Sequence, residues 1–385
     1  MTAPQDDRIT LSDPDISHLE LETVLRSLGA PRLSGGALVE DFEAAFADWV
    51  GRRYAVAVSS GTLGTWVALR ALGIGPGDEV VCSVHGWHQV AHAVTLCGAT
   101  PVFADIDYWS GCLAADRVAE KIGPATRALL VGNTNGHPAA WRELQAVAEQ
   151  HGLPIVEDST EAIGSRYLGR MTGSFGKLAV FDFSQPSALC CGEGGMVVTD
   201  DPALATELGY LRQHRIEDRL SVSVGSRVPL QAGMSAVTAA LGTAQLERID
   251  EILARRKRVE VDYHAQMQSF EGIKPPYLAA DVDEVHWMLY VVHLGKRFTA
   301  SARAQLVDDM DANGIETAAY CNPLHQQFHY RQLGWKRGQL RNAERIGDRA
   351  LALPLHGHLD TDQVAYIVKT LKDASVNVGA GAAIY

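Results

Sequence analysis

Short apolar runs alternate along the chain with longer segments whose apolar residues recur at helical spacing. The short runs predict strands at 54–58, 78–82, 101–104, 128–131 and 154–157. The helical spacing predicts helices at 61–72, 89–97 and 141–151. Strands separated by helices of about a dozen residues indicate βαβ units and a mostly parallel sheet. In such a sheet a ligand lies at the carboxyl ends of the strands.

Further patterns surround this region. The apolar runs 179–183 and 195–199 predict an antiparallel pair of strands around a loop at 184–194. A helix is predicted over 38–50, and an amphipathic stretch near Leu19–Leu28 belongs to an N-terminal arm. These segments complete the large domain.

The last third of the chain predicts a smaller α+β domain. Residues 234–270 predict one long helix, in which the basic run Arg255–Arg258 is expected to form a solvated face. A strand over 287–294 precedes a helix over 301–313. We expect three parts, namely an N-terminal arm at 1–35, a large domain at 36–255 and a small C-terminal domain at 256–385.

Composition narrows the class of protein. The 385 residues, 46% of them hydrophobic, suffice for a large core and two domains. A net charge of -12 argues against nucleic acid or an anionic membrane as a partner. The six cysteines have no CxxC or zinc-type spacing, the chain starts with polar residues, and no stretch is long and apolar enough to span a bilayer. We therefore expect a cytoplasmic protein.

Short motifs follow one another along nearly the whole chain. They are Phe42-Glu-Ala-Ala-Phe-Ala47, Ser59-Ser-Gly-Thr62, Gly75-Pro-Gly-Asp-Glu-Val80, Gly98-Ala-Thr-Pro-Val-Phe103, Val156-Glu-Asp-Ser-Thr-Glu-Ala-Ile-Gly164, Gly192-Glu-Gly-Gly195, Asn322-Pro-Leu-His325 and Ala352-Leu-Pro-Leu-His356. Their order and spacing resemble the DegT/DnrJ/EryC1/StrS family of pyridoxal-phosphate sugar aminotransferases. The resemblance implies an α/β protein of the PLP-dependent aminotransferase fold type I, with a mostly parallel sheet in the large domain and a smaller C-terminal α+β domain.

Ser187 departs from this family at the centre of its chemistry. Counting back from Gly192 within the family's cofactor-lysine segment puts Ser187 on the lysine. A lysine amine forms the Schiff base with the cofactor aldehyde and shuttles protons, which a serine hydroxyl cannot do in the same way. Lys177 is expected at the far end of the sheet and does not replace it. The resemblance thus implies pyridoxal or pyridoxamine phosphate, non-covalent if bound at all.

The turn Ser60-Gly61-Thr62 matches the family's phosphate cradle. It falls between a predicted strand and a predicted helix, where backbone N–H groups and the helix dipole favour an anion. By the resemblance, Thr62 and Leu63 hold the cofactor phosphate. A plain helix cap is the alternative.

Three residues match the ring-binding positions of the family. By the resemblance, Trp87 stacks on the pyridine ring, Asp158 keeps the ring nitrogen protonated and Glu161 lies near the phenolic oxygen. The alternatives are a core or interface role for Trp87 and a helix cap for Asp158. The position of Asp158 at a predicted strand end favours the functional interpretation.

Three further positions depart from the pattern. Asp182 replaces a serine that donates to the phosphate, and two like charges about 4 Å apart repel by roughly 4 kcal/mol at an effective dielectric near 20. Gln231 and Gly233 fall where the family has an asparagine and an arginine, the asparagine reaching the phosphate of the neighbouring subunit. Gln231 can still donate a hydrogen bond, whereas Gly233 cannot replace an arginine.

Histidines near the inherited pocket are candidates for other chemistry. His85 and His88 flank Trp87 and are candidate catalytic bases that would assist Ser187. Cys190 and Cys191 follow Ser187 in the loop. A metal held by the histidines and nearby carboxylates is an alternative that we do not favour, because the spacing is not a metal signature.

The sequence therefore predicts a divergent homologue of these aminotransferases, in secondary-metabolite or nucleotide-sugar or cyclitol biosynthesis, without ordinary lysine-dependent transamination of its small-molecule substrate. Two alternatives stay open. One is a non-catalytic subunit that pairs with an active paralogue, and the other is an enzyme that reuses the pocket for cofactor-independent chemistry. Because the family's dimers share residues between their sites, we expect a homodimer, or a heterodimer with the paralogue.

Overall fold

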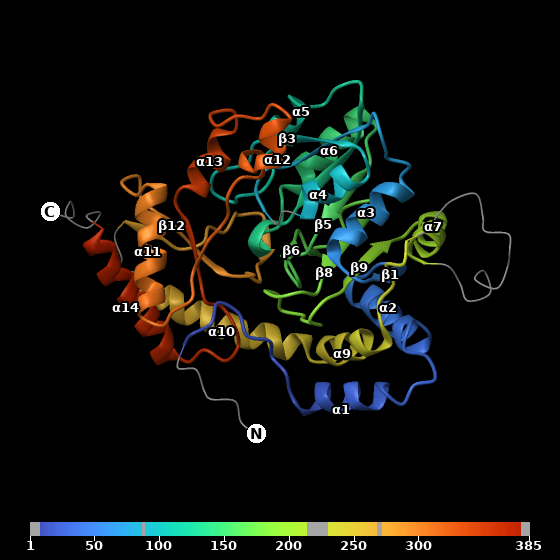
Figure 1. Ribbon diagram of the computed structural model, residues 1–385, viewed down its shortest axis with the longest axis horizontal. Coiled ribbons are helices and arrows are strands. Elements are labelled where there is room, and N and C mark those ends of the chain that lie inside the picture. The colour runs from blue at the N-terminus through green and yellow to red at the C-terminus, as the bar shows by residue number, and fades with distance from the viewer. Residues whose placement is uncertain (1–7, 87–88, 214–229, 268–271, 379–385) are drawn as a thin grey trace.

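A seven-stranded sheet lies at the centre of the protein (Figure 1). The computed structural model describes residues 8–86, 89–213, 230–267 and 272–378. In spatial order the strands are β1 (Tyr54–Val58), β9 (Gly195–Thr199), β8 (Leu178–Asp182), β5 (Ile155–Asp158), β4 (Thr126–Gly132), β2 (Glu79–Ser83) and β3 (Thr100–Ala104). The pairs from β8 to β3 are parallel, and β9 pairs antiparallel with both β8 and β1. This confirms the predicted mostly parallel sheet and the antiparallel pair.

Helices cover both faces of this sheet. One face carries α3 (Gly61–Ala71), α4 (Gln89–Leu96) and α7 (Pro202–Arg212). The other carries α2 (Ala37–Val50), α6 (Trp141–His151), α9 (Ala236–Glu247) and α10 (Ile249–Met267), with α5 (Ala115–Ala119) beside α6. Because both faces are covered, apolar residues on successive positions of a strand are buried, as in the four residues 178–181 of β8.

The C-terminal part forms a smaller unit around a second sheet. This sheet is antiparallel, in the order β10 (Ile273–Lys274), β12 (Tyr290–Leu294), β14 (Ala350–Leu353) and β13 (Ala318–Ala319). Its helices are α11 (Ala300–Ala312), α12 (Phe328–Gln332), α13 (Arg341–Gly347) and α14 (Thr361–Asn377). A small third sheet joins β11 (Val282–Glu284) to β6 (Arg166–Tyr167) and β7 (Arg170–Met171), and 3₁₀ turns lie at Thr134–Gly136 and Leu324–Gln326.

The prediction of one long helix over 234–270 is wrong. The chain forms two helices, because α9 ends at Glu247 and Arg248 has φ -103° and ψ 8°, outside the α-helical region. The second helix, α10, begins at Ile249. The expected domain boundary between residues 255 and 256 falls within α10. The division into arm, large domain and small domain remains a proposal.

The prediction that Arg255–Arg258 forms a solvated face is wrong for Arg256, whereas Arg258 is exposed. Arg256 is 7% exposed and donates hydrogen bonds to the backbone carbonyls of Leu355, Trp287 and Met288 at 2.7–2.9 Å. Burial lowers the pKa of Arg256 to about 10. Its guanidinium therefore joins α10 to the loops around the second sheet through carbonyl groups.

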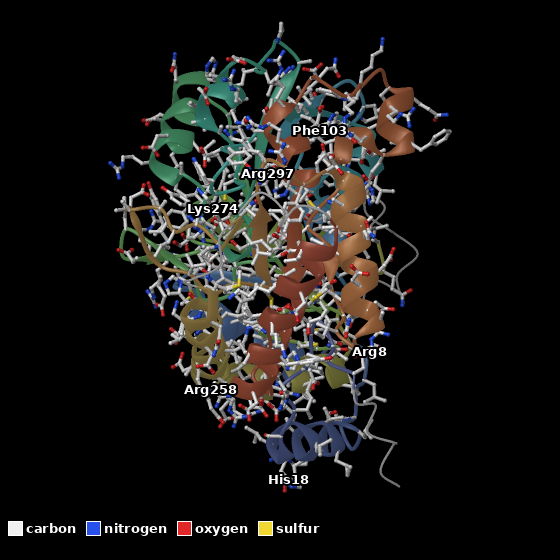
Figure 2. The ribbon with its side chains drawn as sticks, turned by 90° about the vertical axis from the view of Figure 1, so that its left-hand side faces the viewer. Arg8, His18, Phe103, Arg258, Lys274 and Arg297 are labelled. Carbon is white, nitrogen blue, oxygen red and sulfur yellow. The ribbon has the colours of Figure 1, made fainter. Side chains whose placement is uncertain are left out.

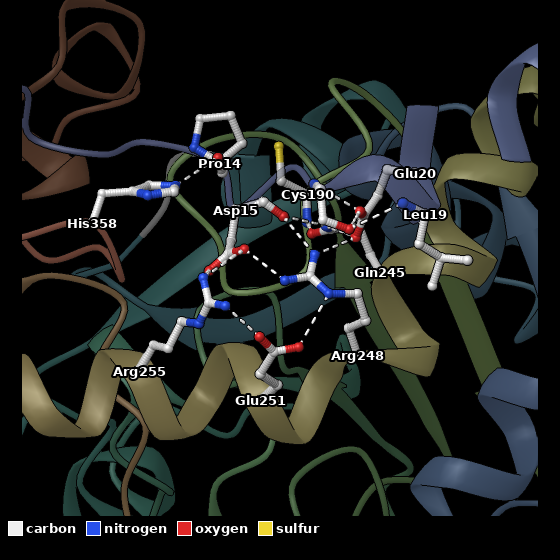
Figure 3. Close-up of polar contacts among 11 residues, drawn as sticks. Pro14, Asp15, Leu19, Glu20, Cys190, Gln245, Arg248, Glu251, Arg255 and His358 are labelled. Carbon is white, nitrogen blue, oxygen red and sulfur yellow. Dashed lines mark hydrogen bonds and ion pairs between the residues drawn. The ribbon is translucent and has the colours of Figure 1, made fainter. Parts of the chain in front are cut away.

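The N-terminal arm ends in α1 (His18–Ser27), which lies at one end of the molecule, marked by His18 in Figure 2. Ser17 and Glu20 form a capping box at its start. Glu20 and Asp15 also accept hydrogen bonds from Arg248, at 2.7 and 2.9 Å (Figure 3). The arm is thereby attached to the junction of α9 and α10.

None of the helices within the described residues is long and apolar enough to cross a membrane.

Candidate functional site

The carboxyl ends of the parallel strands bring several predicted site residues to one edge of the sheet. Asp158 ends β5, Asp182 ends β8, and His85 follows the end of β2. All three side chains are buried, with exposed fractions of 6%, 3% and 4%. This is where a ligand of a parallel sheet is expected.

Asp158 and Glu161 are buried carboxyls, and no cationic side chain among the described residues donates a hydrogen bond to either of them. Asp158 accepts a hydrogen bond from the backbone N–H of Thr160 at 3.0 Å. Burial, assisted by the nearby charge of Asp182, raises the pKa of Asp158 to about 6. Burial likewise raises the pKa of Glu161 to about 7. Near neutral pH these carboxyls exchange protons readily, as a general acid or base must.

Glu161 is held by groups from two other parts of the chain. Its Oε2 accepts hydrogen bonds from the Tyr320 hydroxyl and from the backbone N–H of Asn135. Its Oε1 is buried and has no hydrogen-bond partner. One oxygen is thus fixed, and the other is available to a ligand.

His85 lies beside this carboxyl. Its Nδ1 is 3.2 Å from the backbone oxygen of Gly111, which favours the tautomer that carries the proton on Nδ1. Its Nε2 is buried without a hydrogen-bond partner, and its ring meets the ring of Tyr320 edge-on at 5.5 Å. Burial lowers the pKa of His85, so the neutral ring presents Nε2 as an acceptor.

Two small cavities meet at His85. The inner one, of about 10 Å³, has room for about one water molecule. It is lined by Ser83, His85, Gly86, Val90, Gly132, Asn133, Thr134, Asp158, Glu161 and Leu324. The second, of about 30 Å³, shares His85 and Thr134 with it and is lined by the aromatic side chains of Trp109, Tyr277, Trp287 and Tyr320.

The turn before α3 forms the predicted helix N-terminus, and a side chain of the chain itself occupies it. The Ser60 hydroxyl caps α3 by accepting from the N–H of Leu63 at 3.3 Å. The Asp182 Oδ2 accepts from the N–H of Gly61 at 2.6 Å, and its Oδ1 accepts from the N–H of Ser184 at 2.8 Å. A Cβ on Gly61 would lie 2.7 Å from Asp182, so this close approach requires glycine.

Ser187 lies in the loop between β8 and β9 and is 9% exposed. Its Oγ is buried without a hydrogen-bond partner, and Ser187 does not line the inner cavity. Lys177 directly precedes β8, so the whole strand separates it from Asp182 and from this loop. Cys190 and Cys191 are buried, and burial raises the pKa of both thiols, which makes them poor nucleophiles.

The segment 231–233 lies beside the end of β1. Gln231 is exposed and Gly233 bridges to Val58. A Cβ on Gly233 would lie 2.2 Å from the side-chain oxygen of Gln213. Gln213 thus occupies the space into which a side chain at position 233 would extend.

Trp87 and His88 lie outside the described residues, so the predictions made for them are not addressed by the structure. Within the described ranges, no group of three or more His, Cys, Asp or Glu side chains is arranged to hold a metal ion.

Tyr320 and Asn135 were missed from the sequence. Tyr320 precedes the recognised motif Asn322-Pro-Leu-His325, and Asn135 follows the end of β4. Asn135 could have been predicted from its position after a strand, because polar residues that follow parallel strands are candidates for a ligand site. No local signal connects Tyr320 to Glu161, since the contact joins residues 159 positions apart.

Comparison with protein families gives one match that spans most of the chain. The model of the DegT/DnrJ/EryC1/StrS aminotransferase family matches residues 14–372. Among curated proteins, GDP-perosamine synthase of Caulobacter vibrioides is 34% identical, covering 96% of this chain and 99% of its own. The spore coat polysaccharide biosynthesis protein SpsC of Bacillus subtilis is 32% identical, with coverages of 94% and 95%.

Solved structures share the same fold. DesV of S. venezuelae, in complex with a ketimine intermediate, is 33% identical, with a TM-score of 0.87 and coverage of 95% of this chain and 98% of its own. A putative sugar aminotransferase, Spr1654 of Streptococcus pneumoniae in its PMP-form, has a TM-score of 0.91 at 24% identity, with coverages of 96% and 98%. These similarities confirm the predicted aminotransferase fold type I.

Proposed function

Because the chain belongs to the DegT/DnrJ/EryC1/StrS aminotransferase family, we propose that it is a divergent sugar-aminotransferase homologue that does not carry out lysine-dependent transamination. The observation that carries this proposal is the buried, unpartnered hydroxyl of Ser187 in the loop where the family has its lysine. Among the described residues, no lysine lines either of the two cavities at His85. The part of the chain that the structure describes therefore offers no lysine amine at these cavities for a covalent link to a cofactor aldehyde.

Family membership supports a pyridoxal phosphate-type cofactor, and the residues fit one end of that molecule. Asp158 suits a protonated pyridine nitrogen, and Glu161 has a free Oε1 for a ring oxygen. Ser187 does not suit the aldehyde end, and Asp182 takes the backbone donor of Gly61 at the phosphate end. A cofactor that binds here is therefore held without a covalent bond, and we assign no reaction step to it.

The side chains of the pocket supply groups for proton transfer. His85 Nε2 is a neutral acceptor, and Glu161 carries a proton at pH values below about 7. A serine hydroxyl is a weak nucleophile unless a base activates it, and no base within the described ranges hydrogen-bonds to Ser187 Oγ. We propose His85 rather than Ser187 as the residue that accepts a proton from a ligand.

The substrate class follows from the relatives. One is a GDP-perosamine synthase and another acts in spore coat polysaccharide biosynthesis, and we propose a small sugar or cyclitol of nucleotide-sugar or secondary metabolism for this chain. The cytoplasm is the compartment we propose.

A dimer is the assembly that we propose. Gln231 is exposed, and the exposed apolar side chains of Leu21 and Leu25 on α1 and of its C-cap residue Leu28 recur at helical spacing. A second copy of the chain would cover such a face. An active paralogue as the partner is the alternative, and copurification of a lysine-bearing chain from the native source would favour it.

An absorbance titration with pyridoxal phosphate tests the proposed function. A cofactor linked to a lysine absorbs in the visible, and borohydride removes this absorbance and fixes the pyridoxyl group on the lysine. We expect no such band and no pyridoxyl-lysine peptide by mass spectrometry. A fixed pyridoxyl group on any lysine would contradict the proposal.

A further inference from the structure

Asp182 supplies an anion to the N-terminus of α3. Its carboxylate bonds to the N–H of Gly61 and to that of Ser184, and the side chain is 3% exposed. A helix N-terminus attracts an anion through its free N–H groups and dipole. Here the Asp182 carboxylate is that anion. A phosphate group that approaches the same turn is therefore repelled by a buried negative charge.

The inner cavity favours a positively charged group, whereas a phosphate site favours a negatively charged one. Its charged lining residues are the carboxyls of Asp158 and Glu161, and no lysine or arginine of the described segments lines it. Asp182 adds a third carboxyl whose charge acts on Asp158. Buried carboxylates need a bound cation or protons for neutralisation.

Two unpartnered polar atoms of this cavity indicate a ligand. His85 Nε2 and Glu161 Oε1 belong to side chains that are more than nine-tenths buried, and neither atom has a hydrogen-bond partner. Both atoms accept hydrogen bonds when His85 is neutral and Glu161 is ionised. An ammonium group donates in several directions, and its size matches a cavity of about 10 Å³.

We propose that this pocket binds the protonated primary amine of a small molecule that carries no phosphate, with the ammonium group between Asp158, Glu161 and His85. The proposal rests on the proposed function in that both take Ser187 to be unable to hold the cofactor covalently. Two sources share the required chemistry, namely pyridoxamine and an amino sugar. The body of the ligand lies outside the inner cavity.

Matched ligand pairs test the proposal on the unmodified protein by calorimetry. Pyridoxamine is compared with pyridoxine and glucosamine with glucose, because each pair exchanges an amine for a hydroxyl. We expect the amine of at least one pair to bind roughly tenfold more tightly than its hydroxyl counterpart. A preference in the first pair alone identifies a pyridoxamine-type ligand, and one in the second pair alone identifies an amino sugar. No preference in either pair overturns the proposal.

A second binding experiment compares pyridoxamine with pyridoxamine 5′-phosphate and tests the effect of the phosphate group. We expect the wild-type protein to bind the unphosphorylated form at least as tightly, whereas Asp182→Ser shifts the ratio roughly a hundredfold toward the phosphate. Asp182→Asn, which removes the charge and keeps the shape, should shift it in the same direction. Tighter binding of the phosphate by the wild type would overturn the inference. Tighter phosphate binding would not contradict the proposed function, because the proposed function fails only if a lysine holds the cofactor covalently.

Proton linkage gives an independent readout. A bound ammonium competes with protons for the carboxyls, so its affinity should rise between pH 5.5 and pH 8, flanking the pKa values of about 6 for Asp158 and about 7 for Glu161. Besides each other, the titratable groups that act on these two carboxyls are His85, Tyr320, Asp182 and Glu157. Glu161→Gln should weaken amine binding and flatten this rise. An affinity that is the same at both pH values, or a Glu161→Gln variant with wild-type affinity, contradicts the site.

Discussion

The carboxylate of Asp182 lies 2.6 Å from the backbone nitrogen of Gly61, at the first residue of α3. The contact joins the end of β8 to the start of the helix that covers it. It makes Asp182 a capping residue of α3 as well as the negative charge next to Asp158.

Removing this contact should destabilise the protein. Asp182→Ala leaves the Gly61 N–H without its acceptor and the helix without its anion, and we expect a loss of about 1–2 kcal/mol in the free energy of unfolding by urea denaturation. Inorganic phosphate at millimolar concentration should restore part of this loss in the variant and leave the wild type unchanged. A wild-type protein stabilised by phosphate to the same degree would show that Asp182 does not fill the anion position.

Restoring the lysine alone should not restore cofactor binding. In Ser187→Lys the amine enters the loop after β8, but Asp182 still repels the phosphate by roughly 4 kcal/mol. We expect the visible, borohydride-sensitive absorbance only in the double variant with Asp182→Ser. The absorbance spectra of both single variants and the double variant decide this, and a strong band in Ser187→Lys alone would contradict the role given to Asp182.

Glu161 should make the protein less stable at high pH. Its folded-state pKa of about 7 lies above its ordinary value of 4.5, so the folded state holds the proton more tightly than the unfolded state. Stability is therefore present at low pH and is lost as the pH rises from about 4.5 through about 7, by about 3 kcal/mol. Glu161→Gln keeps the acceptors for Tyr320 and Asn135 and removes this loss. The melting temperature of Glu161→Gln should exceed that of the wild type at pH 8 but not at pH 5. An equal difference between variant and wild type at both pH values would contradict the prediction.

The network around Gln245 should be important for stability. Gln245 is fully buried, accepts from the N–H of Cys190 at 3.3 Å and donates to Asp15 and Glu20 at 2.8 Å (Figure 3). Gln245→Ala removes three hydrogen bonds and leaves the buried N–H of Cys190 without its acceptor, and we expect a loss of about 3 kcal/mol in urea denaturation. Glu251→Gln on the exposed side of the same network is the matched control and should change stability little. A control as damaging as Gln245→Ala would mean that burial is not the cause.

Arg248 gives the same network an acid sensitivity. Hydrogen bonds from Ser17 and Arg248 overcome the effect of burial and lower the pKa of Glu20 to about 2. The stability that Glu20 contributes is present above pH 4.5 and is lost as the pH falls toward 2. Glu20→Gln should flatten the fall in melting temperature over this range, and an unchanged acid profile would contradict the contribution of Glu20.

Much of the large domain could be predicted from sequence because its signals are local. The strand at 54–58 and the helix at 141–151 have the predicted bounds, since their apolar spacing reflects a sheet covered on both faces. The predictions failed where tertiary contacts decide. The basic run predicts a solvated Arg256. In the folded protein, however, its guanidinium is buried and donates hydrogen bonds to backbone carbonyls from distant parts of the chain. Tyr320 was missed because the folded chain alone brings it to Glu161.

The sequence reveals the negative charge of Asp182 at the site. It does not reveal which backbone groups donate hydrogen bonds to this carboxylate. A carboxylate in a phosphate-binding segment indicates repulsion whatever the exact geometry. That the same carboxylate caps α3 depends on the close approach of β8 to Gly61, which no spacing in the sequence encodes.

The internal anion at α3 also changes how the protein depends on its surroundings. A protein whose helix N-terminus is completed by a bound phosphate gains stability only in proportion to the logarithm of ligand supply. This chain carries the equivalent charge at a fixed distance, whatever the concentration of any vitamin in the cell. Its fold should therefore persist under vitamin B6 starvation, a condition that weakens an aminotransferase relying on its cofactor for part of its stability.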